Sequence, residues 1–346
     1  MEFPKVFQQY KEEQCMQYRE IGTSGIKAST IAVGAWAMGG WMWGGTNEKE
    51  SIDAIHAALD RGVDFIDTAP IYGFGLSEKI VGKALKGKRD DVVIATKCAM
   101  VCRPDKGEFM FNANAEAVDP DGHIPIRLYL GKESIKTEVE ESLRRLGTDY
   151  IDVYQTHWQD STTPISETME ALLELKEEGK IRAIGACNAG IDHLSQYLDV
   201  GQLDSDQEKY SMLDRALEKE QAPYCRDRNI SIFAYSPLAN GLLTGKMTPD
   251  RKFGAGDLRA DNPRFSVENR RRINEMLGEF EPIAEAHNAS MVQLVTAWTL
   301  AKPGITHALC GMRNTTQAEE NAAAGDVSLS RDEIGQIDSI LEKYLG

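Results

Sequence analysis

The stretch Asp67–Glu78 reads D-T-A-P-I-Y-G-F-G-L-S-E, and the expected fold follows from it. The apolar run Val63–Ile66 immediately before it predicts a buried strand. Pro70 and the two glycines that follow break this strand, and Ser77 with Glu78 can begin a helix. The stretch is therefore interpreted as a loop that connects a strand to the next helix.

Two side chains of this loop, Asp67 and Tyr72, follow the carboxyl end of the predicted strand. Parallel α/β sheets place their catalytic residues at this end of their strands. Both residues are therefore candidates for a catalytic site. The alternative from this stretch alone is that Asp67 caps a turn and Tyr72 packs on the surface, so the rest of the chain has to decide.

The pattern of a strand followed by a helix recurs along the whole chain. Strands are predicted at Ile31–Ala35, Val63–Asp67, Val92–Thr96, Ile151–Gln155, Ile181–Ala186, Leu203–Asp206, Ile230–Tyr235 and Ile305–Cys310. Helical periodicity follows each of them, including one long helix over Val267–His287. Eight such repeats, with no linker between them, predict an α/β fold of the (β/α)8 TIM barrel type.

The N-terminal residues lie outside this repeat. Gln17–Ile21 and Ile26–Ser29 flank a turn and predict a β-hairpin that closes one end of the barrel. Residues 1–16 are then an N-terminal extension, and residues 17–346 form a single domain.

Three connections between strands and helices stand out. Long loops are expected after the third and seventh strands, at Met100–Gly131 and Thr244–Ser266, on the same rim as Tyr72. The loop after the first strand, Gly34–Gly45, holds three tryptophans among many glycines. It is interpreted as the wall of a pocket for an apolar ligand, with a packed surface loop as the alternative.

Charge composition limits the expected partners. The chain has 39 lysines and arginines against 54 aspartates and glutamates, which gives a formal net charge of −15. This charge repels phosphate backbones and anionic lipids, so neither nucleic acid nor a membrane is an expected partner. No apolar run approaches the roughly 20 residues that span a bilayer, and Met1–Met16 lacks the pattern of a signal peptide. A cytoplasmic location is therefore predicted.

Cysteine spacing gives no sign of a metal or redox site. The six cysteines form no pairs at such spacing, so free thiols are expected. The run Asp119–His123 is interpreted as a turn. No metal site is predicted.

Lys97 and His157 form a set with Asp67 and Tyr72, because these residues lie at the ends of successive predicted strands. A lysine cation beside a phenol favours the phenolate and lowers a pKa that starts near about 10. A carboxylate beside the lysine keeps that cation charged and oriented. Each residue alone has a structural alternative, such as a salt bridge, but the four together predict a site of proton transfer.

Several motifs then occur in a recognisable order. They are D-T-A-P-I-Y-G from Asp67, T-K at Lys97, Y-I-D before His157, G-A-C-N ending at Asn188, and Y-S-P-L-A-N-G-L-L-T-G-K over Tyr235–Lys246. With them the chain resembles the aldo-keto reductases over about residues 17 to 340. The resemblance implies a (β/α)8 barrel, NADP(H) bound without a Rossmann fold, and reduction of a small-molecule aldehyde or ketone. In agreement, no G-x-G-x-x-G follows a predicted strand.

The resemblance also implies roles for individual residues. Tyr72 would be the general acid/base, Lys97 the cation that lowers its pKa, Asp67 the carboxylate that holds Lys97, and His157 the group that orients the substrate carbonyl. The residues implied in cofactor binding are Asn188 and Gln207 at the carboxamide, Tyr210 stacked on the nicotinamide, Ser236, Leu238, Gly241 and Lys246 over the pyrophosphate, and Gly311, Arg313, Gln317, Glu320 and Asn321 at the adenosine end.

Arg313 favours NADPH over NADH, because an arginine can bind a 2′-phosphate with two hydrogen bonds. Departures from the family pattern weaken this preference: Cys187 replaces a serine, Met312 replaces another serine, and Gln317 replaces an arginine.

Two other functions remain as alternatives. The chain resembles, more distantly, the cofactor-binding β subunits of potassium channels, which predicts tight cofactor binding without turnover. A Schiff-base aldolase with Lys97 as the nucleophile is the second. If the chain is a reductase, the tryptophan-rich loop can stack on a sugar or an aromatic ring, so sugar-derived aldehydes and ketones are the leading expected substrates.

Overall fold

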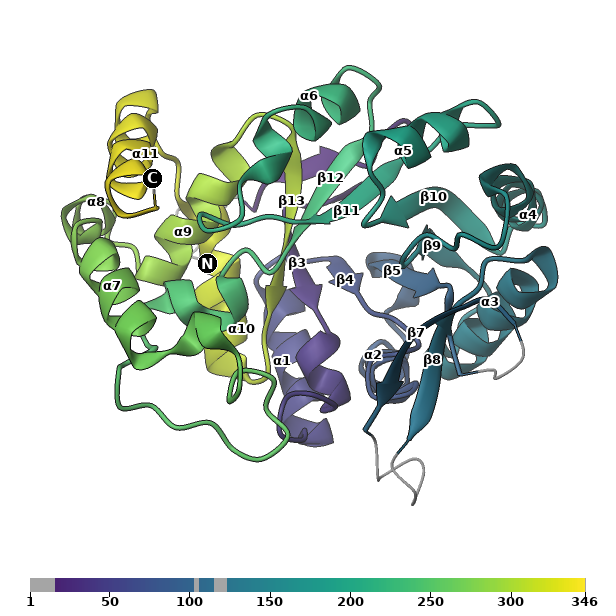
Figure 1. Ribbon diagram of the computed structural model, residues 1–346, viewed down its shortest axis with the longest axis horizontal. Helices are drawn as coiled ribbons and strands as arrows, with labels where there is room; N and C mark the ends of the chain where they lie inside the picture. Colours follow the sequence, from purple (N-terminus) through teal and green to yellow (C-terminus); the bar gives the residue numbers. More distant parts are fainter. Residues whose placement is uncertain (1–15, 103–105, 115–122, 346) are drawn as a thin grey trace, which may run out of the picture.

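The computed structural model describes residues 16–102, 106–114 and 123–345. Its centre is a closed barrel of eight parallel strands, which confirms the predicted (β/α)8 fold (Figure 1). In order around the barrel the strands are β3 (Ile31–Gly34), β4 (Phe65–Asp67), β5 (Val93–Cys98), β9 (Ile151–Thr156), β10 (Ile181–Cys187), β11 (Ser205–Lys209), β12 (Ser231–Tyr235) and β13 (Ile305–Gly311). Each predicted strand corresponds to one of these.

Helices surround the barrel (Figure 1). They are α1 (Glu48–Asp60), α2 (Leu76–Ala84), α3 (Lys132–Leu146), α4 (Ile165–Glu177), α5 (Ile191–Leu198), α6 (Gln221–Arg226), α7 (Val267–Gly278), α8 (Glu281–Ala286), α9 (Met291–Ala301), α10 (Thr315–Ala322) and α11 (Arg331–Leu345). Their apolar faces pack on the outer faces of the strands in one large core.

The first of these helices shows how local sequence directs the fold. The side chain of Asn47 accepts a hydrogen bond from the backbone N–H of Glu50, which satisfies one of the free donors at the start of α1. Ala54, Ile55 and Ala58 then recur on one face and are fully buried. Burying an isoleucine side chain of this kind stabilises the fold by roughly 1.5–3 kcal/mol.

The prediction of a single helix over Val267–His287 is wrong. The structure has α7 and α8 in its place, and the chain turns at Phe280 between them. Pro282 has no N–H to donate within a helix, and its ring would collide with the carbonyl of Gly278 four residues earlier. The helix therefore ends and a new one begins with this proline in its first turn.

The predicted N-terminal hairpin is confirmed. Its strands β1 (Tyr18–Glu20) and β2 (Lys27–Ser29) pair antiparallel, and Ile21 and Ile26 pack with Phe65 inside the barrel. The turn passes so close to the barrel that a Cβ atom on Gly22 would lie 2.4 Å from the carbonyl oxygen of Asp204. The hairpin closes the end of the barrel opposite to the one where Tyr72 lies.

The connection Met100–Gly131 contains structure that the sequence did not predict. Strands β6 (Met100–Val101), β7 (Glu108–Ala113) and β8 (Ile124–Leu128) form an antiparallel sheet in the order β6-β8-β7. This sheet projects beside the barrel below β5 and β9 in Figure 1. Of the turn predicted at Asp119–His123, residues 119–122 lie outside the described residues.

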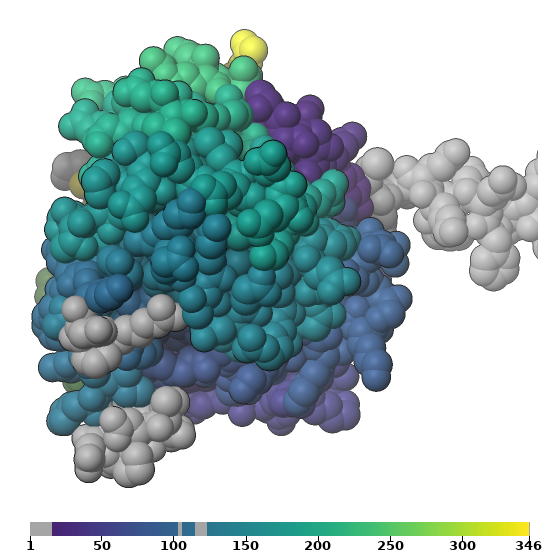
Figure 2. All heavy atoms as spheres, turned by 90° about the vertical axis from the view of Figure 1, so that its right-hand side faces the viewer, coloured from purple at the N-terminus to yellow at the C-terminus, as the bar shows by residue number. Residues whose placement is uncertain are grey.

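The space-filling view in Figure 2 shows a face covered by the blue and teal middle part of the chain, with purple N-terminal residues at its edge. Across the described ranges, no helix combines the length and apolar character needed to span a bilayer.

Candidate active site

Lys97 lies at the centre of a tight polar cluster inside the rim of the barrel. Its Nζ donates to Asp67 Oδ1 and Oδ2 at 2.7 and 2.8 Å, to the carbonyl of Thr68 at 2.9 Å, and to the hydroxyl oxygen of Tyr72 at 3.3 Å. The Lys97 side chain is fully buried. β4 and β5 are adjacent in the barrel, and this pairing brings the carboxylate and the amine together although they are 30 residues apart.

The pKa of Tyr72 differs from the expectation from sequence. Burial raises the pKa of the Tyr72 hydroxyl to about 12; the charge of Lys97 lowers it, but not enough to offset burial, and the charge of Asp67 adds to the increase. The expected effect of Lys97 is therefore present, and the expected net lowering of the pKa is wrong. Tyr72 keeps its proton at neutral pH.

Lys97 is positively charged at neutral pH, whereas His157 is neutral. Burial lowers the pKa of Lys97, but Asp67, Tyr72 and Cys187 together raise it by more, so the amine stays protonated. Burial, followed by the nearby Lys97 cation, lowers the pKa of His157 well below its ordinary value. The imidazole is therefore neutral at pH 7. Its ring stands edge-on to the Tyr72 ring, with centroids 5.7 Å apart.

A cavity of about 540 Å³ opens above this cluster, and Asp67, Tyr72 and His157 line it. One end has an apolar wall formed by Trp36, Trp41, Ile71, Met100, Met110, Phe111 and Trp158. The prediction that the tryptophan-rich loop forms a pocket wall is confirmed. Trp41 packs between Phe74 and Phe111, at centroid distances of 5.1 and 6.3 Å, so the sheet of β7 and β8 completes this wall.

The other end of the cavity is a polar groove. Among the cofactor-binding residues implied by sequence, those that line the cavity are Asn188, Gln207, Ser236, Leu238, Gly241, Lys246, Gly311, Arg313, Gln317, Glu320 and Asn321. Asn188 donates to the carbonyl of His157 and accepts from the hydroxyl of Tyr235, each at 2.9 Å, and Gln207 donates to Asp67 at 2.8 Å. The two amides are thus held firmly beside Tyr72.

The assignment of Tyr210 is corrected by the structure. Its ring is fully buried and stacks on Trp298 at 6.0 Å, and its hydroxyl donates to Glu218, away from the cavity. Tyr235, the last residue of β12, lines the cavity instead. Its position at a strand end, at the start of the Y-S-P-L segment, was the signal in the sequence that could have identified it.

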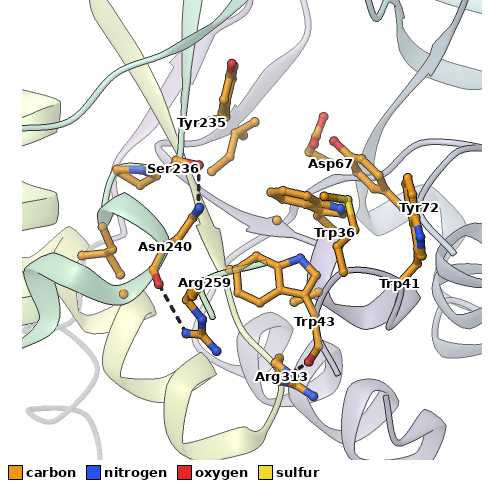
Figure 3. Close-up of a pocket in the computed structure, with 18 of the residues that line it drawn as sticks. Trp36, Trp41, Trp43, Asp67, Tyr72, Tyr235, Ser236, Asn240, Arg259 and Arg313 are labelled. Carbon is orange, nitrogen blue, oxygen red and sulfur yellow. Dashed lines mark hydrogen bonds between the residues drawn. The ribbon is translucent and has the colours of Figure 1, made fainter. Parts of the chain in front are cut away.

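Two loops meet across the groove, and the sequence did not predict this contact. Trp43 pairs with Asp257 through a β-bridge, and the guanidinium of Arg259 lies 5.2 Å from the centre of the Trp43 ring. Arg313 donates to the carbonyls of Trp43 at 3.4 Å and Gly45 at 2.9 Å. Figure 3 shows Trp43 beside Arg259 and Arg313, with Trp36 and Tyr72 further along the cavity.

The loop after β12 has unusual backbone conformations where it borders the groove. Ser236, Ala239 and Asn240 have φ values of 55°, 48° and 55°, a region that residues other than glycine seldom adopt. Strain of this kind is concentrated at functional sites. Ser236 and Asn240 also contact each other through their side chains, at 3.2 Å (Figure 3).

Comparison with known proteins gives a consistent picture. The sequence model of the Aldo/keto reductase family matches residues 30–342. The chain is 41% identical over 333 residues to the Bacillus subtilis protein named aldo-keto reductase YhdN, covering 95% of each chain. It is 44% identical over 318 residues to the Escherichia coli NADH-specific methylglyoxal reductase, covering 90% of this chain and 94% of that one.

Solved structures agree. The glycerol dehydrogenase AKR11B4 from Gluconobacter oxydans superposes with a TM-score of 0.84 at 35% identity, covering 95% of this chain and 96% of that one. An aldo/keto reductase from Klebsiella pneumoniae, solved in complex with NADP and acetate, gives a TM-score of 0.67 at 28% identity and covers 94% of each chain. With its barrel and its family match, the chain belongs to the aldo/keto reductase family, oxidoreductases that act on carbonyl groups with a nicotinamide cofactor.

Proposed function

We propose that this protein is an NADPH-dependent reductase of small uncharged aldehydes and ketones. One observation carries the proposal: the hydroxyl of Tyr72 contacts Lys97 Nζ at 3.3 Å on its buried side and lines the cavity, between an apolar wall and a polar groove. A carbonyl oxygen can then approach the hydroxyl from the side of the apolar wall. Nicotinamide, when bound, supplies the hydride.

Each of the four central residues has a role in this proposal. Tyr72 donates its proton to the carbonyl oxygen as that oxygen gains negative charge. Lys97 then stabilises the phenolate that forms, and Asp67 keeps Lys97 charged and in place. His157, neutral and beside Tyr72, orients the carbonyl oxygen by a hydrogen bond. At neutral pH the Tyr72 phenol keeps the proton that a general acid has to donate in the reduction.

The groove has the donors that a dinucleotide requires. The amides of Asn188 and Gln207 lie beside Tyr72 and retain further hydrogen-bonding capacity for a carboxamide. Tyr235 lines the cavity and Tyr210 does not, which supports Tyr235 as the aromatic ring that stacks on the nicotinamide. Arg313 supplies positive charge further along the groove, where Lys246 forms an ion pair with Glu320.

Arg313 supports the preference for NADPH. In the part of the chain that the structure describes, no carboxylate forms an ion pair with Arg313, so its charge is available to a 2′-phosphate. Two of its N–H groups are used by carbonyls, which leaves three of five for a ligand. Because one relative is named as NADH-specific, the two cofactors have to be compared directly.

The proposed substrates are uncharged because of the apolar wall. Among the described residues that line this end of the cavity, none is a lysine or an arginine. A substrate carboxylate or phosphate would therefore lose its hydration without gaining a partner. Short aldehydes, ketones and 2-oxoaldehydes fit this end, and the tryptophan rings also offer a face to a sugar-derived or aromatic carbonyl.

Consumption of reduced nicotinamide, followed by its absorbance, tests the proposal. NADPH and NADH are each mixed with methylglyoxal, benzaldehyde, a ketone and a sugar aldehyde. Turnover of at least one of them, faster with NADPH, is expected. Tight binding of NADPH with no turnover of any substrate would favour a regulatory binding module. Borohydride trapping of a substrate on Lys97 without a nicotinamide requirement would favour an aldolase.

Two further expectations from the sequence stay predictions. We expect residues 17–346 to behave as one domain after the extension 1–16, and limited proteolysis would test this. A cytoplasmic location remains the expected one.

A further inference from the structure

Two acidic side chains lie behind the turn that carries Asn188. Asp206 and Glu208 are two residues apart on β11, so they project from the same face of the strand, opposite to Gln207. Asp206 is fully buried. Among the described residues, no ion pair involves either carboxyl group. Two ionised carboxylates in contact at a buried site, with no cation beside them, would repel each other strongly.

The hydrogen bonds around the pair leave Asp206 Oδ1 without a partner. Nε2 of Gln221 donates to Asp206 Oδ2 at 2.7 Å and to Glu208 Oε1 at 3.2 Å. Asp206 Oδ1 is buried with no hydrogen-bond partner. The two carboxyl groups interact, so one proton held between Asp206 and Glu208 removes one of the two charges. Burial raises the pKa of both carboxyl groups, and the charge of Glu208 raises that of Asp206 further.

The pair is connected to the candidate cofactor site through one turn of the backbone. Glu208 Oε1 accepts the N–H of Ala189 at 2.8 Å, and Gln221 donates to the carbonyl of Ala189 at 2.9 Å. Glu208 on β11 and Gln221 on α6 thus hold both peptide groups that flank Ala189. The preceding residue, Asn188, has a φ of 53°, in the left-handed region that asparagine adopts more readily than most residues, and the contacts of Ala189 fix the turn beside it.

We propose that Asp206 and Glu208 share one proton and act as positioning residues that hold Asn188 for the nicotinamide carboxamide. Loss of the shared proton weakens cofactor binding. The inference rests on the proposed cofactor role of Asn188. Repulsion between two carboxylates moves Glu208 away from Ala189, and the turn then loses its support. Because the pair keeps the shared proton below its raised pKa, affinity is highest at the lower pH and declines as pH rises.

Other titratable groups that face the pair do not ionise in the same range. They are Cys187 on β10, Cys225 on α6 and Tyr235 on β12, and burial raises the pKa of each. Tyr72, with a pKa of about 12, also keeps its proton. A change in cofactor affinity between about pH 7 and about pH 9.5 therefore reports on the carboxyl pair.

Calorimetric titration with NADPH across this range tests the inference. In the unmodified protein, we expect Kd to increase on the order of tenfold from the lower to the higher pH. Asp206→Asn replaces the donating O–H with an N–H that does not titrate, so its Kd should change by less than about twofold. Glu208→Gln should likewise remove the pH dependence of Kd. It provides the same test if Asp206→Asn folds poorly. The control Asp227→Asn, an exposed carboxylate at the end of α6, should behave like the unmodified protein.

Infrared difference spectra give a second measurement that is independent of cofactor. The carboxylic acid band should weaken as pH rises in the unmodified protein, and at the lower pH it should be weaker in Asp206→Asn than in the unmodified protein. An equal increase of Kd in Asp206→Asn and the unmodified protein, or no acid band, overturns the inference and leaves the proposed function intact. Absence of NADPH binding at every pH overturns both.

Discussion

Replacing Asp67 with Asn removes the counter-charge of the most buried cation in the proposed site. Lys97 would keep its position without the two hydrogen bonds of 2.7 and 2.8 Å that the carboxylate now accepts. The asparagine side chain keeps one acceptor, for which Lys97 and Gln207 would compete. Hydrogen bonds to charged groups contribute about 1.5–3 kcal/mol each, and breaking a buried ion pair costs about 3–5 kcal/mol. We therefore expect Asp67→Asn to lower the free energy of unfolding by about 3–5 kcal/mol.

The sign of the pH dependence makes this prediction specific. Without Asp67, burial lowers the pKa of Lys97 in the folded state below its unfolded value of 10.5. The unfolded state then binds more protons, so stability increases with pH up to that value. The deficit of Asp67→Asn relative to the unmodified protein should consequently shrink as pH rises toward about 10.

Urea denaturation followed by tryptophan fluorescence measures the effect. The double variant Asp67→Asn/Lys97→Met removes both charges and should be less destabilised than Asp67→Asn alone, since no unpaired charge is left. Asp53→Asn is the matched control, because its ion pair with Lys49 is exposed, and it should change stability little. A loss below about 1 kcal/mol for Asp67→Asn, or a double variant less stable than the single one, would refute the reasoning.

Three further predictions concern the proposed reaction. Tyr72→Phe should lower kcat by about 10²–10⁴-fold and leave the Kd for NADPH almost unchanged, because only the proton donor is lost; a parallel loss of NADPH affinity would mean a structural role. The reduction rate should show no inflection near about pH 6.5, where an ordinary histidine titrates, since His157 is already neutral there; an inflection that disappears in His157→Gln would contradict this. Gly39→Ala should greatly reduce activity, because the new Cβ atom would lie 2.5 Å from the carbonyl carbon of Tyr72. The control Gly254→Ala should keep full activity, because no atom lies within 4 Å of its Cβ position. Equal activities of the two variants would show that the loop adapts.

Much of the fold was determined by local features of the sequence. Apolar runs bounded by glycine, proline and capping residues identified all eight strands, because strand and helix periodicity depend on neighbours along the chain. The catalytic candidates followed from one rule, that parallel strands present their carboxyl ends on a common rim. Asp67, Lys97 and His157 each fall at such an end, and the structure brings them together.

Tertiary structure alone decided the rest, because it depends on which distant atoms surround a side chain. Tyr210 and Tyr235 both lie at the end of a barrel strand. Only Tyr235 lines the cavity, because the ring of Tyr210 is buried against Trp298 from α9. The pKa of Tyr72 depends on burial by residues from several loops, and this outweighs the one charge that the sequence identified. The shared proton behind Asn188 likewise requires two carboxyls, an amide from α6 and a turn after β10 to meet, and no spacing along the chain encodes that contact.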